Sequence, residues 1–177
     1  MGHTPRAALA AAAAALLGAA LRPPFLRADE RVSVQRSLVS IYLGDGIKDV
    51  QTLYPPTREW PTYKEGRLVR VHIERSYAKY FPEDAETIRI GLRARKVVHV
   101  QVVFDAEQTR KKPLSELVVD LSMSYGEPRR RRMSYSWQDG ATIMRAFEAE
   151  LPSADGKATE LRTCLEIMDP WVYRPSD

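Results

Sequence analysis

Apolar and polar residues alternate in several parts of the chain, which is the pattern of a β-strand with one face buried. The intervening residues are mostly Arg, His, Glu or Gln, so the opposite face is polar. Six segments are predicted as strands, three in each half: Val69–Ile73, Ile88–Leu92, Val98–Phe104, Met133–Trp137, Ala141–Glu150 and Thr159–Met168. Turn signals typical of antiparallel connections separate several of them: Arg93–Lys96, Gln138-Asp139-Gly140 and Asp155-Gly156.

Two other segments have helical periodicity. The longer runs from Pro113 to Tyr125, with apolar residues three, four, seven and eleven positions after Leu114. Pro113 suits the first helical position, and Gly126 followed by Pro128 ends the helix. The shorter runs from Ile47 to Tyr54, with Asp45 expected to cap its start and Pro55-Pro56 expected to stop it.

The two helical segments share a pattern at a constant offset of 71 residues. Leu43, Ile47, Asp49, Val50 and Tyr54 correspond to Leu114, Val118, Asp120, Leu121 and Tyr125. Each segment is followed by three predicted strands, which indicates an internal duplication; coincidence between two amphipathic helices is the alternative. We therefore predict an α+β fold of two tandem helix-plus-three-strand antiparallel repeats, with the helices packed on one face of the sheet or sheets. The repeats span residues 29–110 and 111–177, or form one continuous domain.

The N-terminal residues have the pattern of a secretory signal. A short leader containing Arg6 precedes the apolar run Ala7–Leu21, and no acidic residue occurs before Asp29. Gly18-Ala19-Ala20 offers the small residues of a cleavage site, and Arg27-Ala28 offers a second, weaker site. The run is short and rich in alanine for a membrane-spanning helix, and too uniformly apolar for a mitochondrial presequence; these are the alternatives to a signal peptide at residues 1–28. Export to the periplasm or outside the cell is therefore expected.

Charge and cysteine content limit the function further. The chain has 27 Lys+Arg and 23 Asp+Glu. Cleavage after Ala28 would remove three arginines and no acid, leaving 24 against 23, so the basic balance belongs partly to the leader and does not indicate nucleic-acid binding. Cys164 is the single cysteine, so no internal disulfide forms and a hydrophobic core must hold the fold. A half-buried structural thiol in a strand is expected there, with an intermolecular disulfide as the alternative.

The sequence contains none of the residue spacings that are typical of catalytic motifs. Nucleophile motifs, phosphate-binding loops and zinc-binding patterns are missing, and beyond His3 in the leader only His72 and His99 remain. Both are expected on the solvated face of their strands. We therefore predict a protein that is not an enzyme and uses no metal or cofactor, with a hydrolase of dispersed catalytic residues as the alternative.

Two features are candidates for binding. The polar face of the first three strands carries cationic and hydrogen-bonding side chains: Arg70, His72, Arg89, Arg93 and His99, with Glu74 and Gln101. Such a face suits an acidic protein or another polyanion. The loop Arg58–Lys64 carries Trp60 and Tyr63, which are typical interface anchors but also typical of a loop folded over a core. The run Arg129–Arg132 is expected to be a solvated turn.

Some of these motifs resemble a known group of proteins. Tyr125-Gly126-Glu127-Pro128, Trp137-Gln138-Asp139-Gly140 and the glycine-rich entry Leu43–Val50 are similar to segments of the small exported domains of the beta-lactamase inhibitor protein and outer-membrane assembly lipoprotein (BamE-like) group. The resemblance covers about Ser40 to Met168 and implies architecture rather than activity. The chain departs from both relatives, because it lacks a lipid-attachment cysteine and cysteine pairs.

From these patterns we expect an exported, non-catalytic binding or inhibitor-like module of the cell envelope that acts through protein–protein contacts. Its partner is an unidentified protein of the envelope or the exterior. Nucleic acid is not expected as a partner, nor a stable membrane span after signal cleavage. A structural envelope protein without a dedicated ligand is a further alternative.

Overall fold

The structure is a computed structural model, and it describes residues 33–152 and 157–173. These residues form one compact unit. The expected signal peptide at residues 1–28 and the turn signal at Asp155-Gly156 lie outside the described residues.

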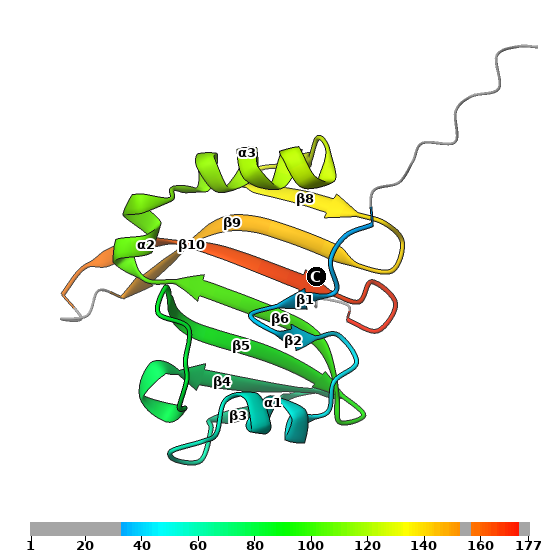
Figure 1. Ribbon diagram of the computed structural model, residues 1–177, viewed down its shortest axis with the longest axis vertical. Coiled ribbons are helices and arrows are strands. Elements are labelled where there is room, and N and C mark those ends of the chain that lie inside the picture. Colours follow the sequence, from blue (N-terminus) through cyan, green and yellow to red (C-terminus); the bar gives the residue numbers. More distant parts are fainter. Residues whose placement is uncertain (1–32, 153–156, 174–177) are drawn as a thin grey trace, which may run out of the picture. The chain divides into compact units, whose positions relative to one another are not determined.

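One antiparallel sheet of eight strands dominates the fold (Figure 1). From one edge to the other, its order is β3 (Thr62–Glu65), β4 (Leu68–Glu74), β5 (Ala85–Arg93), β6 (Lys96–Phe104), β10 (Thr159–Met168), β9 (Ile143–Pro152), β8 (Ser134–Gln138) and β7 (Arg129–Arg131). Strands β3 to β6 are consecutive in the chain, and so are β7 to β10. The pairing of β6 with β10 joins these two meanders at the centre of the sheet.

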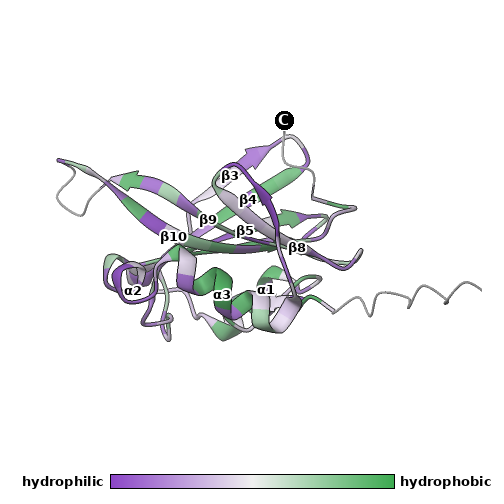
Figure 2. Cartoon of the chain, turned by 90° about the horizontal axis from the view of Figure 1, so that it is seen from above, coloured by the Kyte–Doolittle hydropathy of each residue, from purple (hydrophilic) through white to green (hydrophobic). Residues whose placement is uncertain are grey.

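The helices lie on one side of the sheet, as Figure 2 shows. They are α1 (Ile47–Leu53), α2 (Ala106–Lys111) and α3 (Leu114–Tyr125), and a 3₁₀ turn, η1, follows β4 at Arg75–Tyr77. A small hairpin of β1 (Ser37–Leu38) and β2 (Ile41–Tyr42) lies between α1 and α3 (Figure 1). We call the side of the sheet that carries α1, α2 and α3 the helix face, and the opposite side the distal face.

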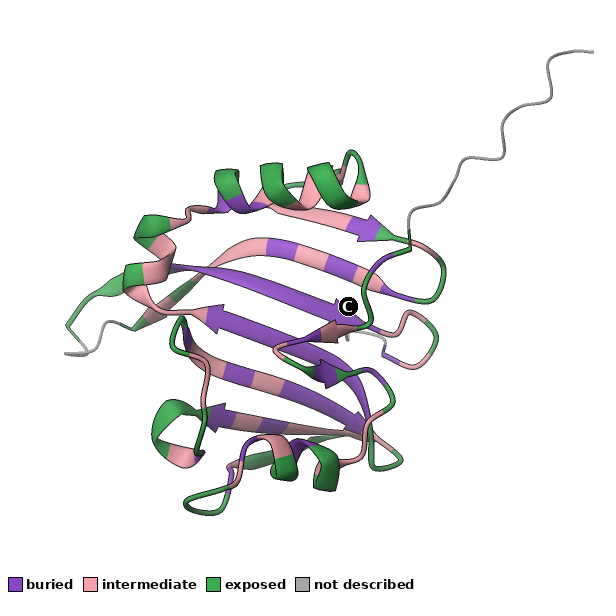
Figure 3. Ribbon diagram, in the orientation of Figure 1, coloured by how far each residue is buried: buried purple, intermediate pink, exposed green. Residues whose placement is uncertain are grey.

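The main core lies between the sheet and the elements on its helix face. Side chains of alternate strand residues, among them Ile90, Val100 and Ile167, are almost completely buried there against Ile41 and Val50. Burial is most continuous along the central strands β6 and β10 (Figure 3). Strand β6 is covered on both faces, which explains why Val97–Phe104 is an apolar run interrupted only by His99 and Gln101. Strand β10 is also buried from Arg162 onward, and its buried charges, Arg162 and Glu166, are paired.

The predicted fold class is wrong. The described chain is mostly β, with a single eight-stranded sheet and three short α-helices of 7, 6 and 12 residues. It does not consist of two helix-plus-three-strand repeats. Four strands, not three, follow each of α1 and α3, and strands from both sides of the expected boundary at residues 110 and 111 join in one sheet. The shared helical pattern reflected the requirements of packing on one sheet face and did not define an α+β tandem repeat.

The individual strands and helices were predicted more accurately than the fold class. All six predicted strands occur with ends shifted by a few residues, and both predicted helices are present. Gly126 ends α3 with a φ of 77°, a left-handed value that favours glycine. At α1, however, the carboxylate of Asp49 accepts a hydrogen bond from the Gly46 N–H, while the Asp45 side chain bonds Tyr42 instead. Arg129–Arg131 form edge strand β7, so the prediction of a turn there is wrong except at Arg132.

Candidate functional site

A row of polar side chains crosses the distal face from strand to strand. Each member is the direct cross-strand partner of the next, so all of them project from the same face. The row runs through seven strands in the order His72, Arg89, Gln101, Glu166, Arg145, Ser136 and Arg129. We call this set the polar row. It contains three arginines and one glutamate, so its net charge is positive.

Glu166 lies at the centre of the polar row and is its most connected member. Its Oε1 accepts a hydrogen bond of 2.6 Å from Nε of Arg145, and the second arginine nitrogen lies 2.5 Å away. Its Oε2 accepts a bond of 3.1 Å from the amide of Gln101 and lies 3.2 Å from Nε2 of His99. Arg89 in turn donates to the Gln101 carbonyl at 3.2 Å. The carboxylate is thus bound on both oxygens.

This arrangement keeps Glu166 ionised. Burial, the largest single influence, favours the neutral acid, but the hydrogen bonds and charges of His99 and Arg145 together outweigh it, so the pKa of Glu166 lies below its usual value. At the end of the row, burial and the positive charges of Arg89 and Arg70 lower the pKa of His72. His72 is therefore neutral at pH 7 and adds no charge to the face.

A C-terminal segment covers one part of the distal face. Tyr173 stacks on His99 with ring centroids 4.5 Å apart and an angle of 8° between the ring planes. Its hydroxyl lies 3.3 Å from a nitrogen of Arg70, and Arg93 donates a hydrogen bond of 2.8 Å to the carbonyl of Val172. Arg70 and Arg93 are therefore partly occupied in holding this segment, although Arg70 also pairs with Glu65.

The structure brings together most of the residues predicted to bind a partner. Arg70, His72, Arg89 and His99 share the distal face, and Tyr63 joins them, since its ring lies 5.1 Å from that of His72. Tyr63 is 57% exposed, as expected of an interface residue. His99 is buried, however, so the expectation of a solvated histidine at this position is wrong.

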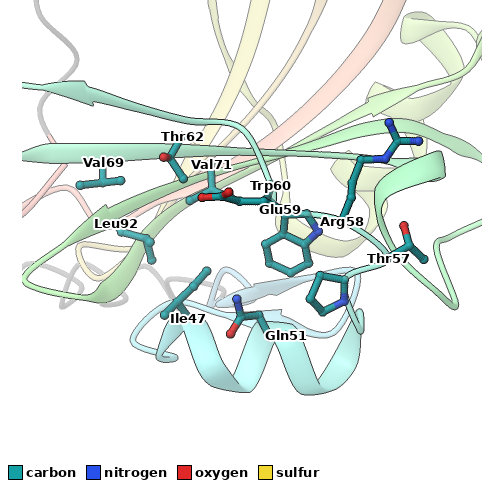
Figure 4. Close-up of a pocket in the computed structure, with 11 residues that line it drawn as sticks. Ile47, Gln51, Thr57, Arg58, Glu59, Trp60, Thr62, Val69, Val71 and Leu92 are labelled. Carbon is teal, nitrogen blue, oxygen red and sulfur yellow. The ribbon is translucent and has the colours of Figure 1, made fainter.

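Trp60 does not belong to this group. Its side chain is buried, its Nε1 donates a hydrogen bond of 2.9 Å to the Tyr77 carbonyl, and it lines a pocket beside α1 on the helix face (Figure 4). The loop Arg58–Lys64 is thus divided between the two faces, because β3 begins at Thr62 and directs alternate side chains to opposite sides.

Sequence reasoning missed Glu166 and Arg145, which organise the polar row. A signal was present: Glu166 is the only charge in the run Cys164-Leu165-Glu166-Ile167-Met168. A charge within an apolar run of that length is buried only if it is paired, so it points to a partner elsewhere in the fold. Its partners on β6, His99 and Gln101, are 67 and 65 residues away in the sequence, so the pattern of a single strand could not identify them, whereas Arg145 belongs to the neighbouring strand β9.

Cys164 lies next to this network on the same face of β10 and is fully buried. Burial raises the pKa of its thiol to about 12. The thiolate form, which is the nucleophile, is therefore strongly disfavoured at neutral pH. The expected position of Cys164 in a strand is confirmed, but the side chain is fully buried rather than half-buried.

Within residues 33–152 and 157–173, no three or more His, Cys, Asp or Glu side chains are grouped so as to hold a metal ion. The same part of the chain contains no helix that is long and apolar enough to span a membrane.

The fold and the site together define an antiparallel-sheet protein with a cationic distal face. Comparison of the chain with family models, curated proteins and solved structures finds no match.

Proposed function

We propose that this chain is a non-catalytic binding protein that recognises an acidic patch on a partner protein through the distal face of its sheet. The polar row carries the proposal, because it places Arg89, Arg145 and Arg129 along a single line across the sheet. Cationic side chains on a continuous surface attract an acidic partner and orient it during association.

The centre of the row and its β7 end differ in a way that suits recognition. Near β9 and β10 the cationic charge of Arg145 is fixed by its bonds to Glu166, so its guanidinium is held in one place while remaining 40% exposed. Toward the β7 edge, Arg129 and Arg131 are exposed and point to the same side. A rigid arginine is better prepared for a bidentate contact with a carboxylate, and exposed ones add long-range attraction.

Export is part of the proposal and rests on the pattern of residues 1–28. It is tested by recovering the protein from outside the cytoplasm and sequencing its N-terminus. A mature chain beginning after Ala20 or Ala28 supports export, and an intact N-terminus in the cytoplasm contradicts it.

Strand β7 provides a matched test of the binding face. Arg129 and Arg131 project from the distal face, whereas Arg130 lies over Tyr135 on the helix face and Arg132 is in the hairpin turn. A partner is first captured from the exported fraction of the source organism, identified and purified. Its affinity is then measured for the wild type and for two double variants, Arg129→Ala/Arg131→Ala and Arg130→Ala/Arg132→Ala. Both double variants lose two positive charges, so they differ only in whether the distal face of the sheet is changed.

We expect the Arg129→Ala/Arg131→Ala variant to bind about tenfold more weakly and with a smaller dependence on salt, because rim charges act largely through attraction in solution. The Arg130→Ala/Arg132→Ala variant should bind like the wild type. Equal affinities for all three proteins would show that the distal face does not contact the partner.

A further inference from the structure

A pocket of about 380 Å³ lies on the helix face, between α1 and the strands near the β3 edge (Figure 4). Its walls are mostly apolar. The residues that make them are Ile47 from α1, Trp60 from the following loop, and Val69, Val71 and Leu92 from the sheet. A pocket of this size and lining is in the range that takes a small organic molecule.

The pocket is formed by side chains that are already fixed. Trp60 is only 5% exposed and is anchored by its hydrogen bond to the Tyr77 carbonyl. Val71 is 2% exposed and belongs to the paired region of β4. A ligand therefore meets an indole and a strand surface that need not reorganise, which reduces the entropic cost of binding.

The charges at the pocket point to the chemistry of its ligand. Arg58 and Glu59 both contribute to the lining, but the guanidinium of Arg58 lies 4.3 Å from the centroid of the Tyr77 ring and points away from the pocket in Figure 4. The carboxylate of Glu59 has no hydrogen-bond or ion-pair partner among residues 33–152 and 157–173. Arg58 keeps its charge but is directed away from the pocket, so the ionised group that remains at the pocket is the carboxylate of Glu59.

We propose that this pocket binds a small molecule with an apolar ring system and a protonated amine. The ring lies against Trp60 and the valines, and the ammonium group pairs with Glu59. An ammonium beside an indole is also attracted to the face of the ring. The site lies on the opposite side of the sheet from the polar row, so it is independent of the proposed protein-binding function.

Two probes of nearly equal size and opposite charge test this assignment. The protein is titrated with 2-(1-naphthyl)ethylamine and, separately, with 1-naphthylacetate, and affinity is measured by calorimetry. The indole N–H signals of the three tryptophans report the location by NMR. Trp60 should shift, while Trp137, which is bonded to the Gly126 carbonyl, and Trp171, which is bonded to the Gly140 carbonyl, should not.

We expect the amine to bind with a Kd on the order of 0.1–1 mM, as its size allows. The acetate should bind about two- to fivefold more weakly, which is the range of an exposed ion pair. Glu59→Gln should remove this preference, while Glu116→Gln, an exposed glutamate on α3, should keep it.

Blocking variants test the location from two sides. Thr62→Trp fills the pocket from the exposed strand β3, and Gln51→Trp fills it from α1; both positions line the pocket and are exposed, so at least one variant is expected to fold normally. The folded variant should bind neither probe. An unchanged Trp60 signal with both probes, or equal affinity of the wild type for amine and acetate, would overturn the proposal.

Discussion

Oε2 of Glu166 lies 3.2 Å from Nε2 of His99 across the central strand pair, and each side chain is only 3% exposed. The two residues come from β10 and β6, the strands that join the two meanders. A charged contact thus lies at the one place where both halves of the sheet meet. Its loss should be felt by the whole fold rather than by a single hairpin.

Stability should therefore depend on the ionisation of Glu166. The pKa of Glu166 is lower in the folded protein than the value of about 4.3 expected in the unfolded chain, so the folded state binds fewer protons. The stabilisation is complete above about pH 4.3 and is lost as the pH falls through the folded value. We expect Glu166→Gln to lower the free energy of unfolding by about 3 kcal/mol at pH 7, measured by urea denaturation.

The same variant should also flatten the pH dependence. Between pH 5 and pH 3 the wild type should lose more stability than Glu166→Gln does. Glu116→Gln, which removes an exposed carboxylate from α3, should follow the wild type. Parallel curves for all three proteins would mean that Glu166 does not contribute to acid sensitivity.

Tyr173 should anchor the C-terminal segment mainly through its ring. Tyr173→Ala removes the stack on His99 and should lower the free energy of unfolding by about 2–3 kcal/mol. Tyr173→Phe keeps the ring and loses only the 3.3 Å contact with Arg70, so it should cost less than about 1 kcal/mol. Thermal and urea unfolding measure both, and an equal cost for the two variants would place the stabilisation in the hydroxyl instead.

Gly91 should be intolerant of any side chain. A Cβ at this position would lie 3.0 Å from Cβ of His99 and 3.4 Å from Cδ1 of Leu68. Gly91→Ala would push His99 away from Glu166, at an expected cost of about 1–3 kcal/mol. Thr87→Ala, on the same face of β5, is the matched control. If Gly91→Ala is as stable as that control in urea, β5 and β6 can separate without disturbing the network.

Cys164 should be protected from thiol reagents while the protein is folded. Because burial raises the pKa of Cys164 to about 12, its thiolate is scarce at pH 8 and the sulfur is out of reach of solvent. We expect no reaction with Ellman's reagent in buffer and one equivalent in denaturant. Ser115→Cys, which adds a thiol at an exposed position of α3, should react at once with one equivalent in buffer. Rapid labelling of the folded wild type would contradict the prediction.

Strands that are half buried were predictable, because burial on one face imprints a period of two on the sequence. Val69, Val71 and Ile73 in β4 are an example. The sequences of the edge strands β3 and β7 lack this alternation. All four residues of β3 and all three of β7 are exposed, so neither face required apolar residues and the pattern was lost. Helix α2 was missed for the same reason, since none of its residues is buried.

The candidate site was predictable in part. Alternation placed Arg70, His72, Arg89 and His99 on one face correctly, because side-chain direction follows from the strand pattern alone. The burial of His99 could not be predicted from alternation, because it depends on Tyr173 and Glu166, two residues far away in the sequence that the fold brings next to it. Strand order across a sheet is set by such pairings, and the sequence pattern of a single strand carries no information about its neighbour.

The central position of β6 has a consequence for synthesis on the ribosome. Its pairing partner β10 begins at Thr159, whereas β6 ends at Phe104. The first meander therefore leaves the ribosome with the valine-rich strand β6 at its edge. This edge stays unpaired until more than fifty further residues have been synthesised and β10 can pair with it. During this interval the nascent chain exposes an unpaired strand that can pair with other chains, so Val97–Val103 is expected to be the segment most exposed to aggregation and most in need of a chaperone.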